Sequence, residues 1–127
     1  MLSLMKTRDL LEMHARLQAL DKSQAVIEFE TDGTILSANE NFLDAMGYTL
    51  EEIQGKHHRM FVEPGYAGSY EYAAFWDALR RGEYQSAEYK RLGKNNREIW
   101  IQASYNPIMD AHGIPTKIVK YATDVTA

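Results

Sequence analysis

Apolar residues in this chain repeat first at helical and then at alternating spacing, and this change of period divides the sequence. Between residues 5 and 20, four leucines lie near helical spacing with charged residues on the other side: Leu10, Leu11, Leu17 and Leu20. The pattern predicts an amphipathic helix whose apolar stripe must be covered, either by a sheet of the same domain or by a copy of itself. We therefore expect residues 1–21 to form a cap or dimerisation element.

A β-hairpin is predicted in the following segment. Ile27 and Phe29 alternate with glutamates, which is the period of a half-buried strand. The dipeptide Asp32-Gly33 supplies the tight turn, because glycine tolerates a positive φ angle. Residues 34–38 then form the return strand.

Short helical segments follow, opened by polar capping residues and closed by glycine or proline. Asn39 or Asn41 is expected to cap the first, which ends at Met46, and Thr49 the second. Trp76 lies on the apolar face of the last and longest segment. The later segments span residues 49–55, 57–62 and 69–79.

Three further strands are predicted at residues 85–92, 97–105 and 116–123. The order of these predicted elements along the chain favours an α+β fold. It would have five strands in one antiparallel sheet, short helices on one face and the N-terminal amphipathic helix as a cap. The other face of the sheet carries Trp100, and we expect this side chain to lie beneath the N-terminal helix.

Composition narrows the class of protein. The chain has 127 residues, of which 45% are hydrophobic and 25% charged, as expected for one globular domain with a short extension. A net charge of −4 disfavours a nucleic-acid partner, and the lack of cysteine excludes disulfides and thiolate chemistry. The sequence contains no apolar run of about 18 residues and no signal-peptide pattern. We predict a cytoplasmic domain without direct membrane contact.

Three motifs in order carry a family resemblance over residues 22–126. They are NENFLDAMGYTLEEIQG, GKNNREIWIQASYNPIMDAHG and the final Asp124-Val125-Thr126. Together they resemble a PAS sensor domain of bacterial chemotaxis and aerotaxis transducers, which places the sensor at residues 22–127. The resemblance implies a parent protein in which Asp124-Val125-Thr126 leads to a downstream signalling domain.

Within that family the segments GYTLEEIQGKHHRM, FWDALRRGE and KNNREIW resemble aerotaxis receptors that bind FAD. The resemblance implies a flavin pocket that includes Asn39, His58 and Trp76. These residue types suit a flat ring with a polar edge. Trp offers an aromatic surface for the ring, Asn offers a hydrogen-bond donor and an acceptor, and the protonation of His responds to a change in the charge of the ring. The chain departs from the flavin receptors at Phe61-Val62-Glu63, where they carry a basic pair before the proline.

Each of these residues also has a purely structural interpretation. Trp76 suits an ordinary core position, Asn39 suits a helix cap, and His57 and His58 cannot both face inward from one short turn. Haem is the alternative cofactor, with one of these two histidines as the axial ligand.

A further alternative is a cofactor-free PAS module that forms a homodimer through its N-terminal helix. The sequence has no nucleophile elbow, phosphate loop or zinc spacing, so we expect no enzyme activity. His57, His58 and Glu63 give only a weak metal-ligand pattern, and no metal site is predicted.

Overall fold

A single antiparallel sheet organises the protein, which is represented by a computed structural model describing residues 6–126. Its strand order is β2-β1-β5-β4-β3, so the last strand lies between the first strand and the long β3–β4 hairpin. This confirms the predicted five-stranded antiparallel sheet. The strands are β1 (Ala25–Phe29), β2 (Ile35–Ala38), β3 (Gln85–Leu92), β4 (Glu98–Met109) and β5 (Pro115–Asp124).

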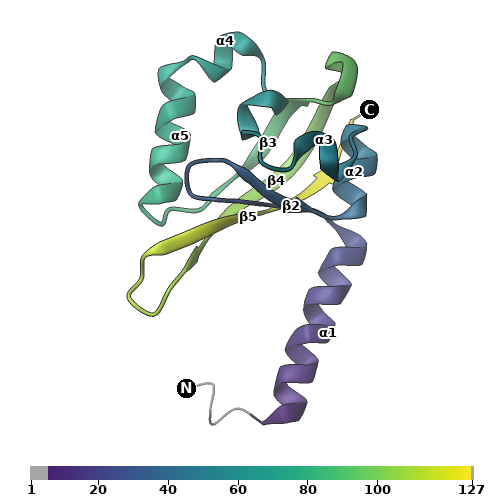
Figure 1. Ribbon diagram of the computed structural model, residues 1–127, viewed down its shortest axis with the longest axis vertical. Helices are drawn as coiled ribbons and strands as arrows, with labels where there is room; N and C mark the ends of the chain where they lie inside the picture. Colours follow the sequence, from purple (N-terminus) through teal and green to yellow (C-terminus); the bar gives the residue numbers. More distant parts are fainter. Residues whose placement is uncertain (1–5, 127) are drawn as a thin grey trace.

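Short helices connect β2 to β3 and lie together on one face of the sheet (Figure 1). The α+β class and its one-sided helical layer are therefore confirmed. The helical segments are α2 (Glu40–Met46), α3 (Leu50–Ile53), the 3-10 turn η2 (His58–Phe61), α4 (Pro64–Ala67) and α5 (Tyr70–Arg80).

The capping residues act where the sequence places them. The side chain of Asn39 accepts a hydrogen bond from the Phe42 N–H at 3.0 Å. Thr49 and Glu52 form a reciprocal capping box at the start of α3. Between β3 and β4, Asn95 and Asn96 adopt φ angles of 63° and 61°, a backbone conformation that asparagine tolerates better than most residues.

Helix α1 (Thr7–Ser23) is present, and no residue of it is buried. Its predicted start at residue 5 lies outside the described residues. The helix meets β1 after only Gln24 and extends away from the domain (Figure 1). No helix within residues 6–126 is long and apolar enough to span a bilayer.

The expectation that Trp100 lies beneath α1 is wrong for the single chain. Trp100 is 42% exposed, and its main chain bonds to Val125 and Thr126 instead. The reason is geometric, because only the C-terminal end of α1 lies beside α2, while the earlier turns of the helix extend away from the domain (Figure 1). An open groove separates α1 from the outer face of the sheet, lined by residues that include Leu17, Val26 and Tyr121.

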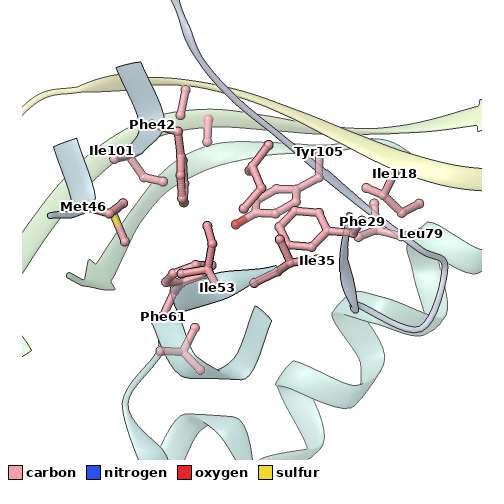
Figure 2. Close-up of a cluster of buried hydrophobic side chains, with 14 of the residues drawn as sticks. Phe29, Ile35, Phe42, Met46, Ile53, Phe61, Leu79, Ile101, Tyr105 and Ile118 are labelled. Atoms are coloured by element: carbon pink, nitrogen blue, oxygen red, sulfur yellow. The ribbon is translucent and has the colours of Figure 1, made fainter. Parts of the chain in front are cut away.

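The core fills the space between the sheet and the short helices. Phe29 and Ile118 on the sheet are fully buried, as are Ile53 and Phe61 on the helical side. Figure 2 shows these side chains converging from the two layers, with the Tyr105 hydroxyl pointing into the middle of the cluster. Each such side chain contributes about 1.5–3 kcal/mol through burial of apolar surface.

A close contact at Gly93 holds the end of β3 against α2. A Cβ atom at this position would lie 2.7 Å from the Met46 carbonyl oxygen and 2.8 Å from Ile99 Cδ1. We predict that Gly93→Ala lowers the free energy of unfolding by about 1–3 kcal/mol through overpacking. Urea denaturation measures the change. Gly65→Ala is the control, since its Cβ would meet no atom within 4 Å among the described residues outside its own helical turn, and equal stability of the two variants would contradict the prediction.

Candidate functional site

The candidate site is centred on His58, the one fully buried histidine among residues 6–126. The 3-10 turn η2 directs His58 inward, while His57 points outward and holds the hairpin turn. His57 Nε2 lies 2.7 Å from the Asp32 carbonyl oxygen, and His57 Nδ1 accepts from the Arg59 N–H. The expectation that only one histidine of the pair faces inward is confirmed.

A chain of hydrogen bonds runs through His58 from the sheet to α5. Its Nε2 atom lies 2.9 Å from the Tyr105 hydroxyl on β4, and its Nδ1 atom lies 2.7 Å from the Tyr72 hydroxyl on α5. The Tyr105 oxygen also accepts from Arg91 Nη2 at 3.1 Å and from Arg91 Nε at 3.3 Å.

These bonds assign the tautomer of His58. Two Arg91 donors occupy the lone pairs of the Tyr105 oxygen, so Tyr105 must donate its own proton to His58 Nε2. Neutral His58 then carries its proton on Nδ1 and donates it to Tyr72. The hydrogen-bond direction is therefore Arg91 to Tyr105 to His58 to Tyr72.

Aromatic rings surround the His58 imidazole. The ring centroids of Phe29, Trp76 and Phe61 lie 5.3, 5.4 and 5.9 Å from it in edge contacts, and that of Phe75 lies 6.4 Å away in a stacked arrangement. The buried Trp76 Nε1 atom lies near Tyr72 and opposes the rise of its pKa, but it makes no hydrogen bond to any residue in the range 6–126. The site is therefore an aromatic cage with a free indole N–H donor.

Two cations are buried beside this cage. Arg91 is 3% exposed and Lys120 is 1% exposed. The Arg91 guanidinium lies over the Tyr89 ring at 4.6 Å, and Lys120 Nζ lies 5.0 Å from the Tyr105 ring centroid. Lys120 Nζ has no hydrogen-bond acceptor among the described residues.

Burial shifts the pKa values of these groups in a consistent direction. Burial, followed by repulsion from Arg91 and Lys120, lowers the pKa of His58 well below its usual value. Burial and the Arg91 charge likewise lower the pKa of Lys120. Burial raises the pKa of Tyr72 to about 12 and raises that of Tyr105. The interior thus favours neutral His58 and opposes further positive charge.

The structure brings together two of the three sequence-predicted site residues. His58 and Trp76 are neighbours in the cage. Asn39 instead joins α1, β1 and α2. Its Oδ1 atom accepts from Val26 N and Phe42 N, and its Nδ2 atom donates to the carbonyls of Asp21 and Gln24. Four bonds satisfy an asparagine side chain, and its role in binding a cofactor stays a prediction.

One surface cleft leads toward this interior. It has a volume of about 310 Å³ and lies between β3 and the segment that joins η2 to α4. Val62, Tyr66 and Arg91 line it, and an ion pair between Glu63 and Lys90 spans it. Because Arg91 lines the cleft and also bonds to Tyr105, it connects the opening with the His58 chain. The volume lies at the lower end of the range for small-molecule sites.

Metal-ligating side chains do not gather here. Residues 6–126 contain no group of three or more candidate ligands. His58 uses both ring nitrogens in hydrogen bonds, and Glu63 pairs with Lys90. An axial role for His58 on haem would require it to release one tyrosine.

The buried state of His58 predicts a pH dependence of stability. The pKa of His58 is about 6.5 in the unfolded chain and lower in the folded protein. Below about pH 6.5 the unfolded chain therefore binds a proton that the folded protein does not. Above about pH 6.5 the free energy of unfolding should therefore not depend on His58. Below that pH it should decrease, by up to about 1.4 kcal/mol per pH unit.

Denaturant titrations between about pH 5 and about pH 8 measure this dependence. His58→Gln should lose much of the slope, and the part that remains belongs to His57, whose pKa is also lowered by burial. His112→Gln on the exposed β4–β5 turn is the control and should keep the slope. A wild-type stability that stays constant across this range would contradict the prediction.

Two bacterial proteins are among the relatives of this chain. The chain is 47% identical over 115 residues to the biofilm dispersion protein BdlA of Pseudomonas aeruginosa, covering 91% of this chain and 28% of that protein. It is 35% identical over 75 residues to the aerotaxis receptor of Escherichia coli, covering 59% of this chain and 15% of the receptor. The chain thus spans a minor part of these relatives. The predicted resemblance to PAS domains of the aerotaxis type is confirmed.

Solved structures with the same fold show lower sequence identity. A light-oxygen-voltage domain studied with a flavin analogue superposes with a TM-score of 0.72 at 22% identity, covering 88% of this chain and 85% of that one. A PAS domain from Colwellia psychrerythraea superposes with a TM-score of 0.75 at 21% identity, covering 90% of this chain and 97% of that one. A family model described as PAS fold matches residues 35–122, and this chain therefore belongs to the PAS fold family.

Proposed function

We propose that this domain is the sensory PAS module of a chemotaxis or aerotaxis transducer, which reports redox state or oxygen through bound FAD. The observation that carries the proposal is the His58 chain, a polar path through an aromatic interior that reaches a surface cleft through Arg91. The similarity to an aerotaxis receptor supports the same class of input. The module itself is not catalytic and passes its signal to a downstream domain.

The chemistry of the interior suits a flavin. FAD, when bound, supplies a ring that takes up and releases electrons together with protons. The cage offers aromatic walls and two donors for the polar edge of such a ring, the indole N–H of Trp76 and the amine of Lys120, neither of which has an acceptor in the described part of the chain. Rings now fill the space between sheet and helices, so loading requires η2 and α5 to shift outward. Without cysteine, no thiol bond to a cofactor can form.

The hydrogen-bond chain is suited to relay a change at the ligand. A complete two-state switch requires a difference of about 5.5 kcal/mol in ligand affinity, whereas one hydrogen bond contributes about 1 kcal/mol. The His58 chain joins η2, α5, β3 and β4, so several bonds change together when one of them moves. Tyr105 pairs in register with Lys120 on β5, which ends at Asp124, before the proposed output segment.

A homodimer through α1 is the second part of the proposal. The helix exposes an apolar stripe that includes Leu10, Leu17 and Leu20, and its partner in the signalling protein is a second copy. The negative net charge argues against nucleic acid as a partner. We place the domain in the cytoplasm, without direct membrane contact.

The FAD assignment predicts a role for Trp76 that a plain core residue would not have. The wild-type protein should purify with a flavin absorption spectrum. Trp76→Phe keeps an aromatic ring but removes the free indole N–H, so flavin affinity should fall by about 1 kcal/mol, or roughly fivefold. The ratio of flavin to protein absorbance measures occupancy.

Trp100→Phe is the matched control, because Trp100 lies half-exposed on the outer face of the sheet and should leave flavin content unchanged. Equal flavin content in both variants would assign Trp76 to the core alone. A Soret band in the wild type would identify haem, and not FAD, as the cofactor. A protein that stays colourless after incubation with FAD would favour the cofactor-free module.

The dimer assignment predicts that a charge on the apolar stripe separates the subunits. Leu17 is 57% exposed in the single chain, and Leu17→Glu should convert the dimer to a monomer with the domain still folded. Light scattering coupled to size exclusion gives the mass. Ala19→Glu adds the same charge on the opposite side of α1 and should remain dimeric. A wild-type monomer at high concentration would overturn the assignment.

A further inference from the structure

The interior of this domain carries an unbalanced charge. Arg91 on β3 and Lys120 on β5 are both buried and flank Tyr105 on β4. Within the described part of the chain, no aspartate or glutamate is buried with them. The other titratable groups that face this space are His58, Tyr72 and Tyr89, and none of them carries a negative charge at neutral pH.

Both cations keep unused hydrogen-bond donors. Lys120 Nζ has three N–H groups and no acceptor among residues 6–126. Arg91 spends its bonds on the Tyr105 hydroxyl and the Lys90 carbonyl, which use three of its five N–H groups. The rings of Tyr105 and Phe42 attract the lysine charge at 5.0 and 5.6 Å but accept no conventional hydrogen bond from it.

A buried amine without an acceptor is unfavourable for folding, because water would satisfy its donors in the unfolded chain. Packing alone does not require it, since Ile118 and Ala122 fill the neighbouring inward positions of β5 with apolar side chains. Groups that destabilise a free protein in this way are characteristic of functional sites.

We propose that the ligand of this domain presents an acidic, oxygen-bearing edge to Lys120 and Arg91. The proposal rests on the sensor function above, because it places that ligand in the same interior. Two sources share this chemistry. One is a flavin ring, which gains a single negative charge when it takes up two electrons and one proton, and the other is a free carboxylic acid.

The route to the two cations is defined by Arg91, which lines both the surface cleft and the interior. Glu63 on the rim is neutralised by its ion pair with Lys90, so this part of the entrance does not repel an anion. An acidic edge that passes Arg91 reaches Tyr105, and next to it Lys120. The arrangement thus pairs the ligand charge with both cations at once.

Lys120→Met tests the proposal, since methionine is close to lysine in shape and carries no charge. The variant is expected to fold with a raised melting temperature when ligand-free, because an unpaired buried amine is removed. Lys120→Leu serves as a second variant. Lys117→Met is the control, because Lys117 lies on the same strand, faces outward and pairs with Glu28 at 2.5 Å.

With flavin-loaded protein, a dithionite titration measures the midpoint potential. Loss of Lys120 should weaken binding of the reduced ring relative to the oxidised ring about tenfold or more, which lowers the potential by about 30 mV or more. Lys117→Met should leave the potential unchanged. A yellow Lys120→Met protein with the wild-type potential would overturn the acidic-edge proposal and leave the flavin sensor intact.

If the protein stays colourless, the second arm uses succinate and acetate at matched ionic strength. The proposal is supported if either acid raises the melting temperature of the wild type and of Lys117→Met but not of Lys120→Met. That result would identify a free acid, and not FAD, as the ligand. No rise in any of the three proteins overturns the acidic-edge proposal.

Discussion

The Tyr105 hydroxyl is the contact on which the rest of the interior depends. It donates to His58, at 2.9 Å, and accepts from Arg91, so one oxygen atom joins η2, β3 and β4. Both lone pairs and the proton of this oxygen are used, which fixes the protonation of His58 and, through it, the bond to Tyr72 on α5. The sheet and the helical layer are therefore held together by a polar chain inside an aromatic core. Disturbance of any member by a ligand alters contacts in both layers, which is the physical basis of the proposed sensor.

Sequence patterns predicted the elements well because the determinants are local. Alternation at Ile27 and Phe29 gave the first strand, and side-chain caps at Asn39 and Thr49 fixed the helix starts. The inward direction of one histidine of the pair also followed from the shortness of the turn at residues 57–62. The position of α1 could not be predicted from the sequence, since an exposed apolar stripe does not identify the surface that it contacts. The prediction that α1 covers Trp100 was wrong for this reason.

The buried cations were missed although the sequence contains a signal for one of them. Lys120 is two residues from both Ile118 and Ala122 along β5, and this spacing places its side chain on the same inner face as theirs. Its burial was overlooked because lysine is rarely buried without a partner. Arg91 had no comparable signal, since its environment depends on Tyr89 and Tyr105, which the fold alone brings together. Asn39 was recognised as a cap, yet its links to Asp21 and Gln24 required the structure.

The ¹⁵N chemical shifts of the His58 imidazole, recorded with and without bound ligand, test the central claim most directly. The account predicts that His58 in the ligand-free protein carries its proton on Nδ1, remains neutral well below pH 6.5, and changes its shifts when the interior is occupied. A His58 that titrates near its ordinary pKa, or whose shifts do not respond to the ligand, would contradict the account.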